Sequence, residues 1–168
     1  TFALQLHSGA NLISINVLSE SSSIESVLES LGNNVSGVIG EGLSASFTDG
    51  GLWVGSLINV DVQDGYWIKV DDEDILLING MPTIRNNEYE LNLGANLISY
   101  PFRYASSIGY SLPEDIGCQI NGIIGEGVAA SCIDGIGWIG SLSNLEGGYG
   151  YWFKTDNSLN ITFNGCDN

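Results

Sequence analysis

Basic residues are scarce in this sequence: four lysines and arginines face twenty aspartates and glutamates, which gives a formal charge of −16. A surface with that charge repels nucleic acids and anionic membranes, so we expect neither as a partner. Long apolar runs are also missing, which excludes a helix that spans a bilayer. Charged residues make up only 14 % of the chain, and Gly, Ser and Asn fill the expected surface. This composition favours an extracellular module over a cytoplasmic enzyme, and the acidic excess suits salty surroundings.

The residues that zinc sites and enzymes use are also few. One His and three Cys without a C-x-x-C pair argue against a zinc site. The short motifs of serine hydrolases, zinc proteases and phosphate-binding loops are absent. We therefore expect no enzyme activity, no metal site and no cofactor. Adventitious calcium at residues 71–74 (Asp-Asp-Glu-Asp) is the alternative, since calcium prefers several oxygens from one loop.

The chain does contain an internal duplication. Residues 9–14 (Gly-Ala-Asn-Leu-Ile-Ser) return unchanged as residues 94–99. Roughly two in five positions are identical between the copies, without a gap, which is more than chance explains. The other repeated stretches are Gly-Val-Ile-Gly-Glu-Gly at 37–42 (Gly-Ile-Ile-Gly-Glu-Gly at 122–127), Trp-x-Gly-Ser-Leu at 53–57 and 138–142, and Gly-Tyr-Trp at 65–67 and 150–152.

The duplication sets the expected domain organisation. We expect a first module at residues 1–80, a linker at 81–87 and a second module at 88–168. About 80 residues build only a marginal core, so the two modules should pack together as one unit. The chain begins at Thr1 without a signal-peptide pattern, and we interpret it as a mature product or a piece of a longer polypeptide.

Short apolar runs between Gly-rich turns predict strands over most of each module. One helix is expected in the first module, where Ser22 and Glu25 form a capping box and Gly32 follows the last apolar residue at helical spacing. Pro113 leaves only a short helical turn in the second. The sequence therefore predicts a mainly β fold: a duplicated antiparallel β-sandwich or barrel, with one short helix per repeat and pseudo-twofold symmetry. The expected strands are residues 2–6, 12–17, 35–41, 43–47, 52–57, 65–70 and 75–78.

All three cysteines lie in the second copy, as Cys118, Cys132 and Cys166. If residues 125–127 form a hairpin turn, Cys118 and Cys132 come close together across it. The sequence leaves open a Cys118–Cys132 disulfide, three free thiols or another pairing.

The repeated stretches carry a resemblance. The order Gly-x-Asn-Leu-Ile-Ser, Trp-x-Gly-Ser-Leu, Gly-Tyr-Trp resembles tandem β-modules of large secreted, cell-surface and phage structural proteins, often from marine bacteria and phages. It covers nearly the whole chain, once per copy, although Ala10 and Ala95 stand where the family usually has an aromatic. The resemblance implies an accessory or display module located outside the cell or on a virion surface. It implies no catalytic residues and no particular ligand.

The repeated polar residues have competing interpretations. Glu41 and Glu126 could face each other across a pseudo-twofold axis as the carboxylate pair of a glycoside hydrolase. We favour a structural role, in which each carboxylate accepts bonds from backbone N–H groups near its Gly-Glu-Gly turn. Asn11 and Asn96 are expected to bond nearby backbone at their turns.

The aromatic residues fall into two groups. Trp53 and Trp138 share a strand face with the leucine four residues later, which favours the core. Trp67 and Trp152 share a face with a lysine and are candidates for a sugar-stacking platform. Tyr100 and Tyr149 are further candidate ligand contacts, because the first copy has no aromatic at their positions.

Together these features predict a non-catalytic extracellular module for display, adhesion or assembly within a larger protein. The alternative is a carbohydrate-binding module that uses exposed aromatics. Its expected partners are other domains of the parent protein or a surface polysaccharide.

Overall fold

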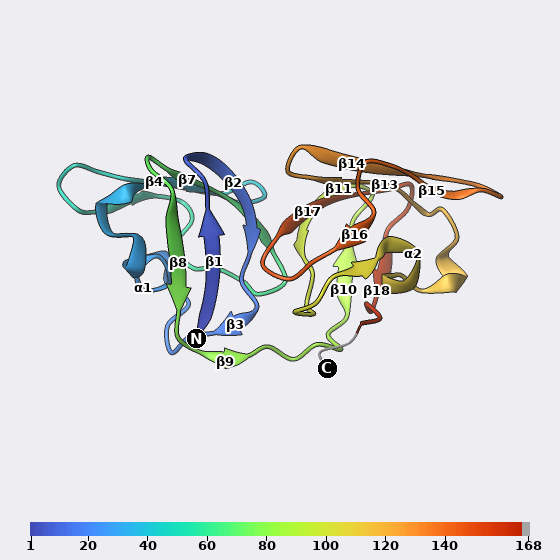
Figure 1. Ribbon diagram of the computed structural model, residues 1–168, viewed down its shortest axis with the longest axis horizontal. Helices are drawn as coiled ribbons and strands as arrows, with labels where there is room; N and C mark the ends of the chain where they lie inside the picture. Colours follow the sequence, from blue (N-terminus) through green and yellow to red (C-terminus); the bar gives the residue numbers. More distant parts are fainter. Residues whose placement is uncertain (166–168) are drawn as a thin grey trace.

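The computed structural model describes residues 1–165 and shows a mainly β protein built from antiparallel sheets. Figure 1 shows two similar halves side by side. Each half has its own cluster of buried apolar residues. The predicted fold class, including the duplication and its pseudo-twofold arrangement, is confirmed.

Each module is built on a five-stranded antiparallel sheet with the same strand order. In the first module the order is β2 (Gly9–Ser14), β7 (Gly65–Val70), β4 (Val35–Ile39), β5 (Ser44–Phe47) and β6 (Trp53–Gly55). In the second it is β11 (Gly94–Ser99), β17 (Gly150–Thr155), β13 (Ile120–Gly125), β14 (Val128–Ile133) and β15 (Gly137–Gly140).

Two-stranded ribbons pack below these sheets (Figure 1). They are β1 (Phe2–Leu6) with β8 (Asp74–Ile78), β10 (Tyr89–Leu91) with β18 (Leu159–Ile161), β3 (Val17–Leu18) with β9 (Met81–Pro82), and β12 (Ser106–Ser107) with β16 (Asn144–Leu145). Strand β9 occupies the start of the expected linker, so the first module extends into residues 81–82.

The helices are shorter than expected, and their caps differ. Helix α1 (Ile24–Val27) is capped by Ser23, whose hydroxyl accepts a bond from the Ser26 N–H at 3.2 Å. The predicted capping box at Ser22 is wrong, because the Ser22 hydroxyl donates to Asn59 Oδ1 at 3.3 Å and the cap is the next residue, Ser23. The remaining helical segments are η1 (Glu29–Asn34), α2 (Ile108–Ser111) and η2 (Glu114–Ile116), of which η2 is the turn expected after Pro113.

The repeated Asn residues close the turn before β2 and its equivalent. Asn11 accepts the His7 N–H at 2.9 Å and donates to the carbonyls of His7 and Gly9. Asn96 makes the matching bonds in the second module. The predicted role in local backbone bonding is confirmed.

The Trp-x-Gly-Ser-Leu stretch contributes its Trp and its Leu to the core side of each sheet. Trp53 and Trp138 pack against the apolar core of their module, as predicted. At Gly55 a Cβ would lie 2.2 Å from the Ser44 carbonyl oxygen, and Gly140 has the same conflict with Ala129. Only glycine fits there, which explains why both copies keep it.

Cys118 and Cys132 form a disulfide, with 5.4 Å between their Cα atoms. This confirms one of the three arrangements that the sequence leaves open, while Cys166 lies outside the described residues. Within residues 1–165 no helix has the length and hydrophobicity of a membrane span.

Candidate functional site

The two modules meet through their repeated residues. Glu126 reaches from its turn into the first module, where its Oε2 accepts the Leu12 N–H at 2.9 Å. Glu41 makes the reciprocal contact, accepting the Leu97 N–H at 2.9 Å. We expected each carboxylate to bond backbone near its own turn, and instead each bonds the backbone of the other module. The Gly-Glu-Gly turn is therefore an inter-module contact.

The serines that end the Gly-x-Asn-Leu-Ile-Ser stretches complete this contact. The Ser14 N–H donates to the Gly148 carbonyl at 2.9 Å, and its hydroxyl donates to the Tyr149 carbonyl at 2.7 Å. Ser99 donates in the same way to the carbonyls of Gln63 and Val62. Both serines are fully buried.

The glycines of the Gly-Tyr-Trp stretches lie where the two modules approach each other closely. A Cβ at Gly150 would lie 2.7 Å from the Ile13 carbonyl oxygen and 3.3 Å from the Gly65 Cα. A Cβ at Gly65 would lie 2.9 Å from Leu97 Cδ1. Each module contacts the other through the same set of equivalent residues, so both copies of this surface are occupied in the pair. A third module would find no copy of the surface left to bind.

The reciprocal contact bears on the hypothesis that Glu41 and Glu126 form a catalytic pair. The two carboxylates line different pockets, and each already accepts a backbone N–H bond. Two carboxylates must flank one bond to act as a glycosidase pair. The structure does not bring Glu41 and Glu126 together around a shared cavity.

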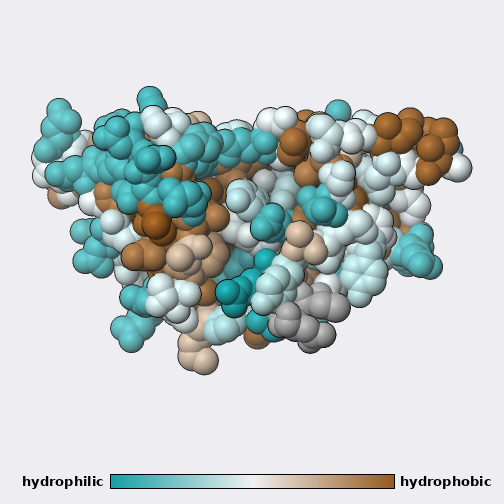
Figure 2. Space-filling model, in the orientation of Figure 1, coloured by the Kyte–Doolittle hydropathy of each residue, from teal (hydrophilic) through white to brown (hydrophobic). Residues whose placement is uncertain are grey.

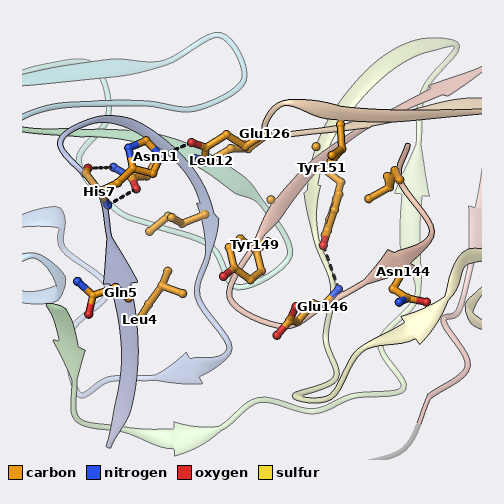
Figure 3. Close-up of a pocket in the computed structure, with 15 residues that line it drawn as sticks. Leu4, Gln5, His7, Asn11, Leu12, Glu126, Asn144, Glu146, Tyr149 and Tyr151 are labelled. Atoms are coloured by element: carbon orange, nitrogen blue, oxygen red, sulfur yellow. Dashed lines mark hydrogen bonds and ion pairs between the residues drawn. The ribbon is translucent and has the colours of Figure 1, made fainter. Parts of the chain in front are cut away.

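A groove of about 380 Å³ lies beside this contact, between strand β1 and the segment that follows β15 (Figure 3). We call it the junction groove. Its apolar floor comes from residues of both modules, and polar side chains with one tyrosine form its rim. The rim comprises Gln5, His7, Glu126, Asn144, Glu146 and Tyr149, and the floor includes Leu4, Leu12, Ile13, Val128 and Leu142.

The repeat-equivalent pocket on the first module has different chemistry. It measures about 310 Å³ and is lined by three carboxylates, from Glu41, Asp61 and Asp64. Asp64 stands at the position of the exposed Tyr149, and the aromatic residue that lines this acidic pocket is the buried Tyr66, the equivalent of Tyr151. The two equivalent pockets have therefore diverged.

His7 lies at the rim of the junction groove. Its Nδ1 contacts the Ser8 carbonyl at 2.8 Å, and its Nε2 contacts the Glu126 carboxylate. Since both partners are acceptors, the carbonyl of Ser8 and the carboxylate of Glu126 raise the pKa of His7. The stability that this pairing contributes is present below the ordinary histidine pKa and is lost as pH rises through the raised pKa.

Asp64 in the acidic pocket titrates far from its usual range. Burial, together with the charges of Asp61 and Glu41, raises the pKa of Asp64 to about 6. The folded state therefore favours the neutral carboxyl, and stability falls as pH rises from the unfolded pKa near 4 through about 6.

We expect Asp64→Asn to stabilise the protein at pH 7 and to change nothing at pH 3. The gain should be about 1 kcal/mol, less than the full pKa shift implies, since the Asp64 side chain is only partly buried and solvent screens its charge. Thermal unfolding of both proteins across pH 3–8 measures the difference. Asp49→Asn, which removes a charge from an exposed turn, is the matched control. An equal effect of both substitutions would trace the gain to net charge instead of the pocket.

The structure separates the four candidate ligand-binding aromatics. Tyr100 is fully buried in the second core, so its prediction as a ligand contact is wrong. Its counterpart in the first copy is the apolar Ile15, a signal for the core that the sequence did contain. Tyr149, 40 % exposed, lines the junction groove.

Trp67 and Trp152 are half-buried on the outer faces of their sheets, away from the cores. Each pairs across the sheet with an exposed isoleucine, Ile39 or Ile124. They remain candidates for a stacking surface.

The sequence did not single out Gln5, Asn144 or Glu146. These residues lie far apart in the chain, and no spacing pattern marks them. Only the packing of the modules brings them to one groove.

The acidic stretch at residues 71–74 has a structural role at one position. Asp74 accepts bonds from the Asn34 amide and the Ile75 N–H, and these bonds lower the pKa of Asp74. Among residues 1–165 no group of three or more His, Cys, Asp or Glu side chains is placed to hold a metal ion.

Exposed isoleucines gather at the free end of the β14–β15 hairpin, which Figure 2 shows as a hydrophobic patch at the end of the second module. Ile133, Ile136 and Ile139 form this apolar tip, with exposed fractions of 43 %, 70 % and 50 %. Strand β15 is also the edge of its sheet. Edge strands and exposed apolar patches are surfaces that protein contacts commonly use.

Comparison with known proteins found no matching family model, no matching curated protein and no matching solved structure.

Proposed function

We propose that this chain is a non-catalytic module of a larger extracellular protein, in which it serves display, adhesion or assembly. One observation carries the proposal: the residues that the two copies share build turns, sheets and the inter-module contact. Glu41 and Glu126, the strongest catalytic candidates in the sequence, belong to that contact. A closed pair held in this way is a rigid unit suited to positioning other parts of a protein.

Two further features support the proposal. The Cys118–Cys132 disulfide suits an oxidising compartment, such as the outside of a cell or a virion surface. The apolar tip at the edge strand β15 suits contact with another domain of the parent protein.

A second candidate function is carbohydrate binding through Trp67 and Trp152. The observation that favours it is that both indoles are partly exposed on the outer sheet faces, each on the same face as a lysine. Indole faces stack well on the apolar faces of sugar rings, as they do on other rings. Loss of saccharide binding in Trp67→Ala and Trp152→Ala would favour this candidate.

We expect the chain to unfold as one cooperative unit without hydrolytic activity. Differential scanning calorimetry should give a single transition whose calorimetric and van't Hoff enthalpies agree. Two separate transitions would show that the modules do not form one rigid unit.

The absence of hydrolytic activity is tested separately with nitrophenyl glycosides as substrates. The non-catalytic assignment is overturned if the chain hydrolyses them and Glu41→Gln or Glu126→Gln abolishes that activity.

A further inference from the structure

We propose that the junction groove binds one neutral saccharide unit per chain. The site differs from the outer tryptophan faces and does not depend on the display role. Its volume, about 380 Å³, lies near the small end of the range of ligand pockets, about 300–1,000 Å³. That size suits one or two sugar rings.

The polar rim of the junction groove offers free hydrogen-bonding groups. The Asn144 amide, the Glu146 carboxylate and the Tyr149 hydroxyl have no hydrogen-bond partner among residues 1–165, and all three residues are exposed. The Gln5 amide nitrogen reaches backbone carbonyls, which leaves its oxygen as an acceptor. This mixture of donors and acceptors matches the hydroxyl groups of a sugar, whereas an apolar ligand would leave them without partners.

The groove also offers the apolar contact that a sugar ring needs. Figure 3 shows Tyr149 between the side chains of strand β1 and those near Glu146. The backbone that carries the ring is fixed, because it forms a bridge to Ile13 and accepts the Ser14 hydroxyl at 2.7 Å. A tyrosine side chain has only two χ angles, so ordering it against a ligand costs little conformational entropy.

The negative charge at the rim restricts the expected ligand to uncharged sugars. Glu126 and Glu146 lie at the rim, and the chain carries a formal charge of −16, so uronic acids and sulfated sugars are repelled. An organic cation would favour the acidic pocket, where three carboxylates line a similar volume although they are not placed to hold a metal ion. A neutral sugar should prefer the junction groove because only that groove has an exposed tyrosine at its rim. This asymmetry predicts a stoichiometry of one ligand per chain.

The test is to screen the full chain on an array of neutral oligosaccharides built from hexose, pentose and N-acetylhexosamine units. Hits are then titrated by isothermal calorimetry against four variants. Tyr149→Asp installs the residue found at the equivalent position of the first module, and Asn144→Ala removes an exposed amide. Asn59→Ala removes the equivalent amide of the acidic pocket, and Trp152→Ala tests the outer face. A circular dichroism melt establishes that each variant is folded.

We expect a one-to-one complex that Tyr149→Asp and Asn144→Ala each weaken about tenfold or more, the factor that losing one good contact gives. Asn59→Ala and Trp152→Ala should bind like the unmodified chain. The proposal is overturned if no neutral saccharide binds at about 10 mM. It is also overturned if Trp152→Ala abolishes binding while Tyr149→Asp does not. A third outcome against it is that arginine methyl ester, used as a cationic probe, binds to the chain while no neutral sugar does.

Discussion

Replacing Gly150 by alanine is expected to lower the free energy of unfolding by about 2–3 kcal/mol, near the upper end of the usual cost of overpacking. The added Cβ would lie 2.7 Å from the Ile13 carbonyl oxygen and 3.2 Å from Leu12 Cδ1. The nearest atom is backbone of the other module, so a rotamer change cannot remove the conflict. The modules must move apart, which also weakens the Ser14 bonds to residues 148 and 149.

Denaturant unfolding measures this loss, and Gly109→Ala is the matched control. A Cβ at Gly109 meets no heavy atom within 4 Å, and the residue lies in helix α2. Because alanine is the better helix former, the control should be neutral or stabilising by up to about 1 kcal/mol. If Gly150→Ala and the unmodified chain are equally stable, the contact between the modules has room for a Cβ at residue 150, contrary to the structure.

The local parts of the fold could be read from the sequence. Strands β1 (Phe2–Leu6) and β7 (Gly65–Val70) have the predicted bounds, since alternation within a strand depends only on neighbouring residues. Comparing the copies also predicted the buried face of β6: Trp53 recurs as Trp138, whereas Leu52 is replaced by Gly137. Leu52 is 67 % exposed, as that replacement indicates.

The inter-module contact could not be read in the same way. Glu41 and its partner Leu97 are 56 residues apart, and Glu126 and Leu12 are 114 apart. A Glu between two glycines has the same local pattern whether it bonds its own turn or another module. The repeat shows that the residue matters in both copies, but only the packing shows what it contacts.

The candidate ligand contacts illustrate the same limit. Tyr100 and Tyr149 were predicted together, because neither has an aromatic counterpart in the first copy. The chemistry of the counterpart separates them: Ile15 indicates a core position, and Asp64 indicates a surface position. Tyr100 lies in the core, and Tyr149 lines the junction groove. Since the shared residues build the fold, we infer that the residues in which the copies differ carry the specific function.

Removing the Cys118–Cys132 disulfide is expected to cost about 3 kcal/mol. The two cysteines are 14 positions apart in the sequence, and the chain-entropy model assigns roughly that value to a loop of this length. In the first module Asn33 and Phe47 stand at these positions, and the Phe47 ring packs on Trp53 with 5.1 Å between centroids. The second module pairs Cys132 with Trp138 in the same register, so the disulfide replaces a ring contact.

Chemical denaturation of Cys118→Ala/Cys132→Ala against the unmodified chain, with and without dithiothreitol, measures this cost. Cys118→Ala/Cys132→Phe restores the ring arrangement of the first module and should recover about 1 kcal/mol, the usual value of an aromatic pair. The helical segment after Pro113 has three residues and none of them is buried, whereas its counterpart in the first module has six and buries Leu31, so the crosslink lies where the second module has less helix packing. If reduction leaves the unfolding curve unchanged, the disulfide does not stabilise the fold and gives no support to an extracellular location.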